Sequence, residues 1–495
     1  MRTLVLGIFL ALTMASGGSR AAAPPLLDRQ GLLADVDVLQ RAYEQMHPGL
    51  YRYNTPVQMQ VHFDALRRAL DRDQSLGDAY LAFSQFAAKV RCGHTYANFY
   101  NQSKATQAAL LHAPSRVPFH FRWIDGRMIV SRDFTSAHVL PRGTEIVSID
   151  GVTAGDILER LMTVARADGG NDAKRHAQMQ VQGDDEYEAF DVFLPLFFPQ
   201  IDGQQTLRIR APGDRTPREI NVNALTQTQR VASRRIDSGD DTAGWRLDFE
   251  TDGLAILTMP DWALYDGRWN WKAFLQSAFE RIQAQGASAL VFDLRGNEGG
   301  LDVGDEIVPH LIGTDLPVVA APPLVRYRKV SADLAPYLDT WDPSFNDWGA
   351  AAVPHDARYL RLTRYEDAGK GAVALSPRAP RFGGKVFVLV GPANSSATFQ
   401  FAEQVQQSGL VKLVGQPTGG NRRGINGGAF FFLRLPNSGI ELDVPLIARF
   451  PAGNPPDAGL LPDLPVTPTV EDIVAGKDAE LAAVRKHLQI DGGKR

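Results

Sequence analysis

The stretch KVFVLVGPANSSATFQFA, residues 385–402, joins two different periodicities at a short polar turn. Residues 385–390 are apolar and rich in valine, which is typical of a buried strand of a parallel sheet. Beyond the turn, apolar residues recur at helical spacing up to Gly409, a suitable end for a helix. The hydroxyls of Ser395 and Ser396 therefore stand at the junction of a strand and a helix.

Two roles fit hydroxyls at this junction. Serine is a preferred N-cap residue, because its side chain accepts a hydrogen bond from a free N–H of the first helical turn. A serine at a helix N-terminus is also a suitable nucleophile, because the unpaired N–H groups there can stabilise an oxyanion. The stretch alone leaves both roles open.

The alternation of strand and helix continues through the second half of the chain. Strand-like segments occur at 254–259, 289–293 and 411–415, and a helical pattern fills 270–286. This order predicts βαβ units around a mostly parallel, buried sheet, in which sites form at the carboxyl ends of the strands. Both the serine turn and the Gly-rich turn DLRGNEGG, residues 293–300, follow such ends.

The first half of the chain has a different organisation. Residues 24–112 have apolar residues at three- and four-residue spacing, which predicts helices, with Ser75 as one N-cap. We expect Gly93 to end the third of these helices and to leave His94 just beyond it. Residues 113–230 change to short alternating strands with Asp-Gly turns, which predicts a β-rich domain.

Composition excludes several classes of protein. The chain has 495 residues, a length that predicts two or three domains, and a net charge of −4 without a long basic run, so we expect no nucleic-acid partner. Its only cysteine, Cys92, excludes an internal disulfide, and a free cysteine is more often a small buried apolar residue than a nucleophile. No H-E-x-x-H spacing is present, and we expect neither a metal nor a cofactor.

The N-terminus has the pattern of a secretory signal peptide. Residues 1–23 combine Arg2, an apolar run over 4–14 and a series of small residues. The run is too short to span a membrane, and no later stretch is long and apolar enough. We therefore expect a secreted or periplasmic protein without a membrane anchor.

Four motifs in the second half occur in the order found in tail-specific, or C-terminal-processing, serine peptidases, which the chain resembles. They are ALVFDLRGNEGG, VFVLVGPANSSATFQFAEQVQQSG, KLVGQPTGG and GLLPDLPV. In addition, LPRGTEIVSIDGVTAGDIL is similar to the closing half of the PDZ domain of that family. The resemblance implies an α/β core domain over 231–490 with a ββα sheet similar to the crotonase and Clp folds. It also implies a PDZ-like β-rich domain over 113–230, following the N-terminal helical domain at 24–112.

The resemblance also implies the roles of the residues at the serine turn. The nucleophile of the family maps to Ser396, with Ser395 as a neighbour. The N–H of Ala397 would give one arm of the oxyanion hole, and the Gly-rich turn would give the other through Gly299 or Gly300.

The chain departs from the family at the general base. Many members use a lysine in a loop after the next strand, where this chain has PTGGNRRG with Asn421, and the arginines that follow stay protonated. In the tricorn-like branch a histidine from the N-terminal region is the base, and CGHTYANF resembles its context, which implies His94. The branch has a carboxylate near the position of Asp457, which would orient His94, but the relay serine of that branch is replaced by Gly93.

We therefore expect an exported serine peptidase that cleaves proteins or peptides, bound in part through the PDZ-like domain. An unperturbed histidine base would make the rate fall at acid pH with a pKa of about 6 to 7. Two alternatives remain open. One is a non-catalytic peptide- or lipid-binding relative of the same fold, and the other is a crotonase-like acyl-CoA enzyme, which export argues against.

Overall fold

The computed structural model describes residues 26–235, 242–265, 267, 269–318, 321–365 and 373–492. The expected signal peptide, residues 1–23, lies outside the described residues. None of the described helices has the length and apolar character needed to cross a membrane.

Helices dominate the N-terminal part, as predicted. They are α1 (Arg29–Met46), α2 (Pro56–Ala69), α3 (Leu76–Val90) and α4 (Lys104–Leu110). Ser75 caps α3 by accepting a hydrogen bond from the Asp78 N–H, as its sequence context predicts. The predicted role of Gly93 is wrong, because α3 ends at Val90 and Arg91 itself adopts the left-handed conformation, with φ 60°.

The middle of the chain is an antiparallel sheet in the order β1-β2-β3-β5-β6, with β4 paired to β3. Asp125 and Gly126, with φ of 50° and 73°, form the predicted tight turn between β1 and β2. The strands are β1 (Phe119–Ile124), β2 (Arg127–Asp133), β3 (Glu145–Ile149), β4 (Val152–Thr153), β5 (Gln204–Arg210) and β6 (Arg218–Asn223). The helices around them are α5 (Ala154–Met162), α6 (Asp172–Gln178), α7 (Ala189–Phe197) and α8 (Gln227–Ala232). The β-rich character is confirmed, and the likeness to a PDZ domain stays a prediction.

The predicted α/β core is confirmed. Its sheet has the order β20-β17-β16-β9-β8-β7, in which every pair is parallel except β7 with β8. Helices cover both faces of the sheet: α9, α10 and α11 pack on one face, and Val484 of α13 packs on the other. The strands are β7 (Arg246–Phe249), β8 (Leu254–Thr258), β9 (Ala289–Asp293), β16 (Lys385–Val390), β17 (Lys412–Gly415) and β20 (Leu464–Pro465). The helices are α9 (Trp271–Ala284), α10 (Gly304–Ile307), α11 (Ser396–Gln407) and α13 (Ala479–Gly492).

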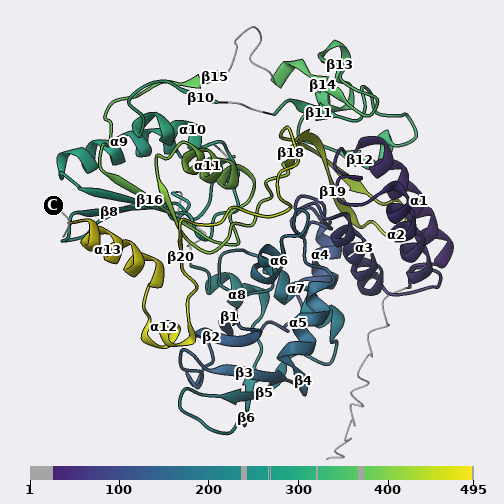
Figure 1. Ribbon diagram of the computed structural model, residues 1–495. Coiled ribbons are helices and arrows are strands. Elements are labelled where there is room, and N and C mark those ends of the chain that lie inside the picture. Colours follow the sequence, from purple (N-terminus) through teal and green to yellow (C-terminus); the bar gives the residue numbers. More distant parts are fainter. Residues whose placement is uncertain are drawn as a thin grey trace, which may run out of the picture.

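A third sheet, which the sequence analysis missed, has the order β12-β18-β19-β11-β14-β13. It consists of β11 (Pro323–Val325), β12 (Leu338–Asp339), β13 (Ala352–Pro354), β14 (Leu360–Leu362), β18 (Ile425–Arg434) and β19 (Glu441–Arg449). These strands come from the predicted core domain, yet they lie beside α1 and α2 (Figure 1), and their buried side chains join those of the N-terminal helices.

The hydrophobic side chains form two separate bodies. One large cluster unites the N-terminal helices, the β1–β6 sheet and the third sheet. The core sheet and its helices form clusters of their own. Helix α6 lies near the centre of the molecule in Figure 1, where these parts meet. The division at 24–112, 113–230 and 231–490 stays a prediction, and residues on both sides of 112 share one core.

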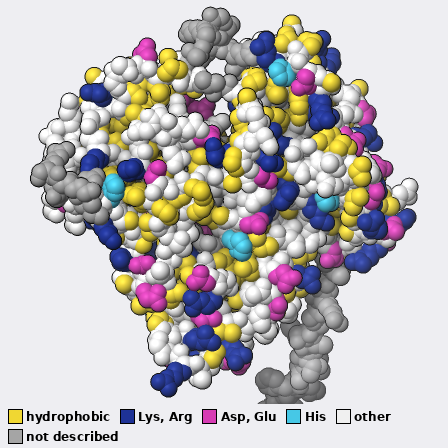
Figure 2. Space-filling view, viewed as in Figure 1, with side chains coloured by type: hydrophobic (Ala, Val, Ile, Leu, Met, Phe, Trp, Pro, Cys, Tyr) yellow, Lys and Arg dark blue, Asp and Glu magenta, His cyan; other side chains and the backbone are white. Residues whose placement is uncertain are grey.

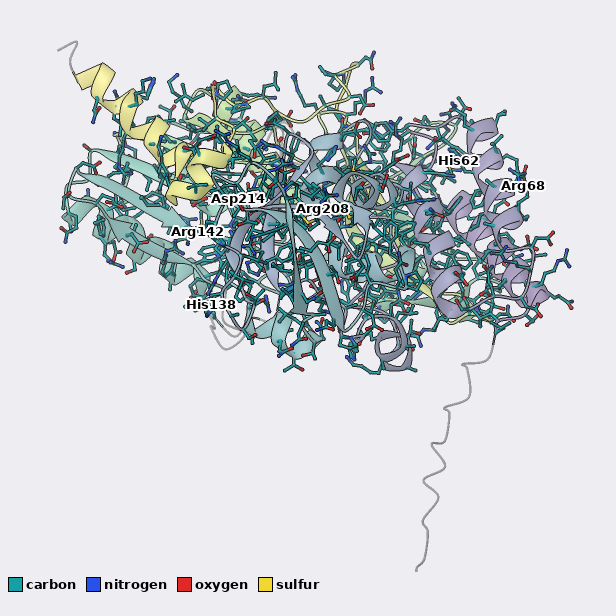
Figure 3. The ribbon with its side chains drawn as sticks, turned by 90° about the horizontal axis from the view of Figure 1, so that it is seen from below. His62, Arg68, His138, Arg142, Arg208 and Asp214 are labelled. Carbon is teal, nitrogen blue, oxygen red and sulfur yellow. The ribbon has the colours of Figure 1, made fainter. Side chains whose placement is uncertain are left out.

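Two further views show how the parts are distributed. From below, α2 with His62 and Arg68 lies at one end, and the β5–β6 hairpin with Arg208 and Asp214 lies nearer the middle (Figure 3). Acidic and basic side chains are interspersed over the face in Figure 2, which agrees with the small net charge of −4.

One buried ion pair joins two helices of the β-rich part. Arg230 of α8 donates to Asp191 of α7 at 2.7 Å and to the Val117 carbonyl, and the two charged side chains are 0% and 2% exposed. We expect Asp191→Ala to destabilise this part by about 3–5 kcal/mol, because it leaves a buried guanidinium without its partner. Asp37→Ala, which breaks the exposed pair with Arg67, is the control and should cost about 1 kcal/mol or less. Thermal melting of the two variants measures the difference, and equal melting temperatures would refute the expectation.

Candidate active site

The turn between β16 and α11 presents Ser396 in a strained conformation. Ser396 has φ 51°, in the left-handed region, which costs a non-glycine residue about 1–3 kcal/mol and is found mostly at functional sites. Its side chain is half-buried, and its hydroxyl has no hydrogen-bond partner among the described residues. A serine on a sharp, strained strand-to-helix turn is the arrangement that exposes a nucleophilic hydroxyl.

The capping role considered for Ser395 is wrong. Ser395 occupies the N-cap position of α11, but its side chain makes no capping hydrogen bond. Its hydroxyl instead donates to the carbonyl of Glu298 at 3.1 Å, in the Gly-rich turn. Asn394 joins the same two turns, because its Nδ2 donates to the carbonyls of Leu294 and Asn297. The polar residues of the serine turn therefore fasten it to the Gly-rich turn.

Two of the three predicted oxyanion N–H groups are available. A Cβ on Gly299, where φ is 110°, would lie 2.8 Å from the Cβ of Ser396 and 2.9 Å from the N of Ala397, so the turn approaches the serine as closely as glycine permits. The Gly299 N–H, however, donates to Oδ1 of Asn297 at 2.8 Å. The N–H groups of Ala397 and Gly300 donate to no other group in the described part of the chain. These two N–H groups are therefore unpaired among the described residues, and their role in an oxyanion hole stays a prediction.

His94 lies on the other body of the molecule, beyond the end of α3. The preceding residue, Gly93, is fixed from both sides: its N–H donates to Asp168 at 3.0 Å, and its carbonyl accepts from Arg166. The imidazole packs beside the ring of Phe430, with 5.8 Å between the centroids, and its Nδ1 is buried without a partner. Among the described residues, no hydrogen bond joins His94 to Ser396.

The structure does not bring Asp457 to His94. The carboxylate of Asp457 accepts hydrogen bonds from the Gly170 N–H at 2.8 Å and from Nδ2 of Asn421 at 2.7 Å. Although desolvation opposes ionisation, these two donors and Arg423 hold the pKa of Asp457 below its usual value. Asp457 is therefore a carboxylate that fixes loops, and the Nδ1 of His94 has no orienting carboxylate in the described residues.

The loop that replaces the lysine loop of the family has a structural role. Asn421 is 3% exposed, and its Nδ2 donates to the Asp168 carbonyl as well as to Asp457. The N–H groups of Gly419 and Gly420 donate to the carbonyl of Asn394 at 2.8 and 2.9 Å. The loop thus holds the serine turn through hydrogen bonds to Asn394, and Asn421, at the position of the family's lysine, cannot act as a base.

An ion-pair network that the sequence analysis missed connects the segments of the site. Lys174 of α6, whose side chain is 3% exposed, places its Nζ 2.6 Å from Oε1 of Glu298, 3.0 Å from the Ala393 carbonyl and 3.3 Å from Oγ of Ser395. Arg166 contacts the other oxygen of Glu298 at 3.5 Å. The stem of Lys174 passes Gly419, where a Cβ would come within 2.8 Å of it. No sequence motif marks Lys174, because it reaches the site from a different part of the fold.

The charge state of Lys174 follows from its partners. Burial lowers the pKa of Lys174, while the carboxylate of Glu298 acts against this. Desolvation disfavours the Glu298 carboxylate, but Lys174 and Arg166 outweigh it and lower the pKa of Glu298 to about 2. Three acceptors surround the Nζ, and only an ammonium has three N–H groups to donate. The Glu298 carboxylate at 2.6 Å favours the ammonium form of Lys174, which has no lone pair for use as a base.

Burial also sets the states of His94 and Cys92. Desolvation, together with the positive charges of Arg166 and Lys174, lowers the pKa of His94 to about 4. The imidazole is thus neutral at neutral pH and able to accept a proton. Desolvation raises the pKa of the buried Cys92 thiol to about 12, so it stays protonated and is not a nucleophile.

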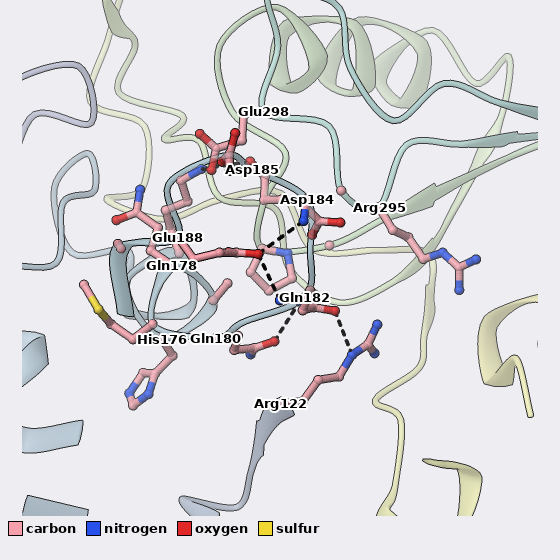
Figure 4. Close-up of a pocket in the computed structure, with 18 of the residues that line it drawn as sticks. Arg122, His176, Gln178, Gln180, Gln182, Asp184, Asp185, Glu188, Arg295 and Glu298 are labelled. Carbon is pink, nitrogen blue, oxygen red and sulfur yellow. Dashed lines mark hydrogen bonds and ion pairs between the residues drawn. The ribbon is translucent and has the colours of Figure 1, made fainter. Parts of the chain in front are cut away.

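A large cavity of about 1030 Å³ is lined in part by Glu298 and Lys174. Figure 4 shows Glu298 and Asp185 at one end of it and Arg122 at the other, with Glu188 held by backbone N–H groups of the wall. The walls come from the β-rich part and from both turns of the site. Among the described residues, no group of three or more His, Cys, Asp or Glu side chains is placed to hold a metal ion.

Comparison with solved structures gives the fold. The chain is similar to mature CPAF, both alone (15% identity, TM-score 0.59, 90% of this chain and 94% of that chain) and complexed with lactacystin (14%, 0.59, 90% and 95%). The D1 C-terminal processing protease of photosystem II matches more weakly, with 16% identity, a TM-score of 0.42 and coverage of 91% and 98%. A search of curated proteins gives no match.

The family comes from the sequence of the core. Residues 253–464, which include the Gly-rich turn, the serine turn and Asp457, match the model of peptidase family S41. This match identifies the core at residues 253–464 as a peptidase family S41 domain of a serine-type peptidase.

Proposed function

We propose that the protein cleaves peptide bonds in proteins or peptides with Ser396 as nucleophile and His94 as general base. The observation that supports this assignment best is the left-handed conformation of Ser396, which holds an unbonded hydroxyl against the Gly-rich turn. The cores of both bodies contribute: Ser396 comes from the core sheet, and His94 comes from the N-terminal helices.

The chemistry follows from these positions. The neutral imidazole of His94 takes the hydroxyl proton as Oγ of Ser396 attacks the scissile carbonyl carbon. The N–H groups of Ala397 and Gly300 stabilise the oxyanion that forms. The imidazolium then gives its proton to the leaving amine. In the second half of the reaction, water attacks the acyl-enzyme, His94 takes the proton of that water, and the proton passes to Oγ of Ser396 as it leaves. Because no hydrogen bond joins His94 to Ser396 among the described residues, this mechanism requires the imidazole and the hydroxyl to approach each other before proton transfer.

Lys174 acts as a positioning residue in this proposal. Its ammonium holds Glu298, Ala393 and Ser395 together, so it connects the Gly-rich turn to the serine turn. Ser395 is the less suitable nucleophile, because its Oγ already donates to the Glu298 carbonyl and accepts from the Lys174 ammonium. Unlike the lysine that acts as base in many members of the family, Lys174 positions the two turns and comes from another part of the chain.

Export and substrate capture complete the proposal. The signal-peptide pattern of residues 1–23 supports a secreted or periplasmic protein. The β1–β6 sheet, which we regard as PDZ-like, would bind extended substrate segments by strand addition. The cavity beside Glu298 offers room for such a segment to reach the site.

The pair Ser396 and His94 should behave as one unit. We expect Ser396→Ala and His94→Ala each to reduce kcat/KM by roughly 10³-fold or more, and the double variant to lose little beyond either one, because each deletion already prevents activated attack. The rates are measured with an unfolded protein as substrate, and thermal melting checks that each variant is folded. Cys92→Ala serves as the control and should keep its activity. Near-full activity of His94→Ala would show that the base lies elsewhere.

The pH profile should differ from that of an unperturbed histidine. Because the pKa of His94 is lowered to about 4, kcat/KM should rise with pH through about 4 and stay level at neutral pH, and not rise through 6 to 7. Arg166→Met removes a charge that lowers this pKa, so the acid limb should move to higher pH. Arg215→Met, on an exposed hairpin turn, makes the same change in net charge and should leave the profile unmoved. An acid limb that moves equally in both variants would contradict the assignment.

The alkaline limb tests the role of Lys174. As an ammonium that positions the turns, Lys174 should make the rate fall when it loses its proton at high pH, whereas a lysine base would make the rate rise there. Lys174→Met should lower kcat by roughly 10- to 100-fold through misplacement of the turns, and its alkaline limb should disappear. Lys104→Met, at the exposed start of α4, is the matched control. A wild-type rate that rises through the alkaline range would make Lys174 the base.

A further inference from the structure

Aromatic side chains extend from His94 along the outer face of β18. The ring of Phe430 lies 5.8 Å from that of His94, and Trp341 lies 5.9 Å from both Phe430 and Phe432, measured between ring centroids. We call Trp341, Phe430 and Phe432 the aromatic shelf. The shelf begins at the proposed base and leads away from it.

The shelf is open, while the opposite face of the same strand is packed. Ala429, Phe431 and Leu433 point into the large hydrophobic core and are fully buried. Phe430 and Phe432 are only half-buried, and Trp341 is 58% exposed. Strand alternation requires one outward face, but it does not require aromatic residues there. Contiguous exposed aromatic surface beside a reactive group is typical of a binding site.

The backbone of β18 is open at the same place. On one edge it pairs with β19, with a register shift between Gly427 and Phe430, but on the other edge β12 pairs only with Phe432 and Leu433. In the described part of the chain, no strand pairs with that edge from Ile425 to Phe431. An extended peptide can add to such an edge, and its alternate side chains then project onto the face of the sheet.

We propose that the aromatic shelf is a substrate subsite that takes a bulky apolar side chain of a peptide lying along β18. This proposal rests on the proposed function, because the shelf adjoins the site only through His94. The rings favour an aliphatic or aromatic side chain, which loses contact with water there. A carboxylate would be desolvated beside the rings without a partner, so acidic residues should be rejected.

A peptide series tests the subsite. Peptides that carry Phe, Leu, Ala or Asp at each position near the cleaved bond are compared by kcat/KM. At one position we expect Phe and Leu to exceed Ala by roughly tenfold or more, and Asp to be cleaved least. Trp341→Ala and Phe432→Ala should lose this preference mainly through a higher KM for the Phe and Leu peptides, with the Ala peptide unaffected. Val57→Ala, an exposed apolar residue of α2, is the control and should keep the preference.

The outcomes separate this proposal from the proposed function. Equal cleavage of all peptides by the wild type, or a preference retained by both shelf variants, would overturn the subsite and leave the peptidase intact. If the wild type cleaves none of them, the proposed function fails, and binding decides the subsite. The Phe peptide is then titrated into Ser396→Ala while tryptophan fluorescence is recorded. A change that disappears in Trp341→Phe supports the shelf, and no change overturns it.

Discussion

The carboxylate of Glu298, held between Lys174 and Arg166, is the interaction on which the candidate site depends. Lys174 connects it to the serine turn through the Ala393 carbonyl, and Arg166 connects it to the His94 segment through the Gly93 carbonyl. The two cations come from one hydrophobic body and the serine turn comes from the other. Without Glu298, the buried ammonium of Lys174 and the partly exposed guanidinium of Arg166 would lose the anion that they share, which is costly for the buried charge.

The sequence predicted the local elements of the core well, because each segment there is consistent with its own periodicity. The strand at Lys385–Val390 and the helix that follows formed as expected, and Ser396, the predicted nucleophile, has a left-handed backbone conformation. What it could not predict was pairing between distant segments. The strands β18 and β19 look like further core strands along the chain, but their buried side chains join the hydrophobic cluster of the N-terminal helices, and only tertiary contacts reveal that choice.

The same limit explains the errors at the site. Asp457 has the spacing of an orienting carboxylate, but a hydrogen bond from Asn421 turns it toward a neighbouring loop. Lys174 has no motif around it and lies more than two hundred residues from the serine it contacts. Its position depends on how α6 enters the boundary between the bodies. The strand-to-helix turn that carries Ser396 could be inferred from sequence, whereas the contacts of Asp457 and Lys174, which join distant segments, could not.

The network has a consequence for catalysis that follows from electrostatics. The cations that fix the turns also disfavour a charged imidazole at His94, and burial adds to this effect. A base with a pKa of about 4 is fully available at neutral pH, but it is a weaker proton acceptor than an unperturbed histidine. Since Glu298 acts in the opposite direction, any movement that brings His94 closer to this carboxylate strengthens the base. In the proposed mechanism, a movement that draws His94 toward Glu298 and Ser396 would raise its basicity as it brings the imidazole to the hydroxyl.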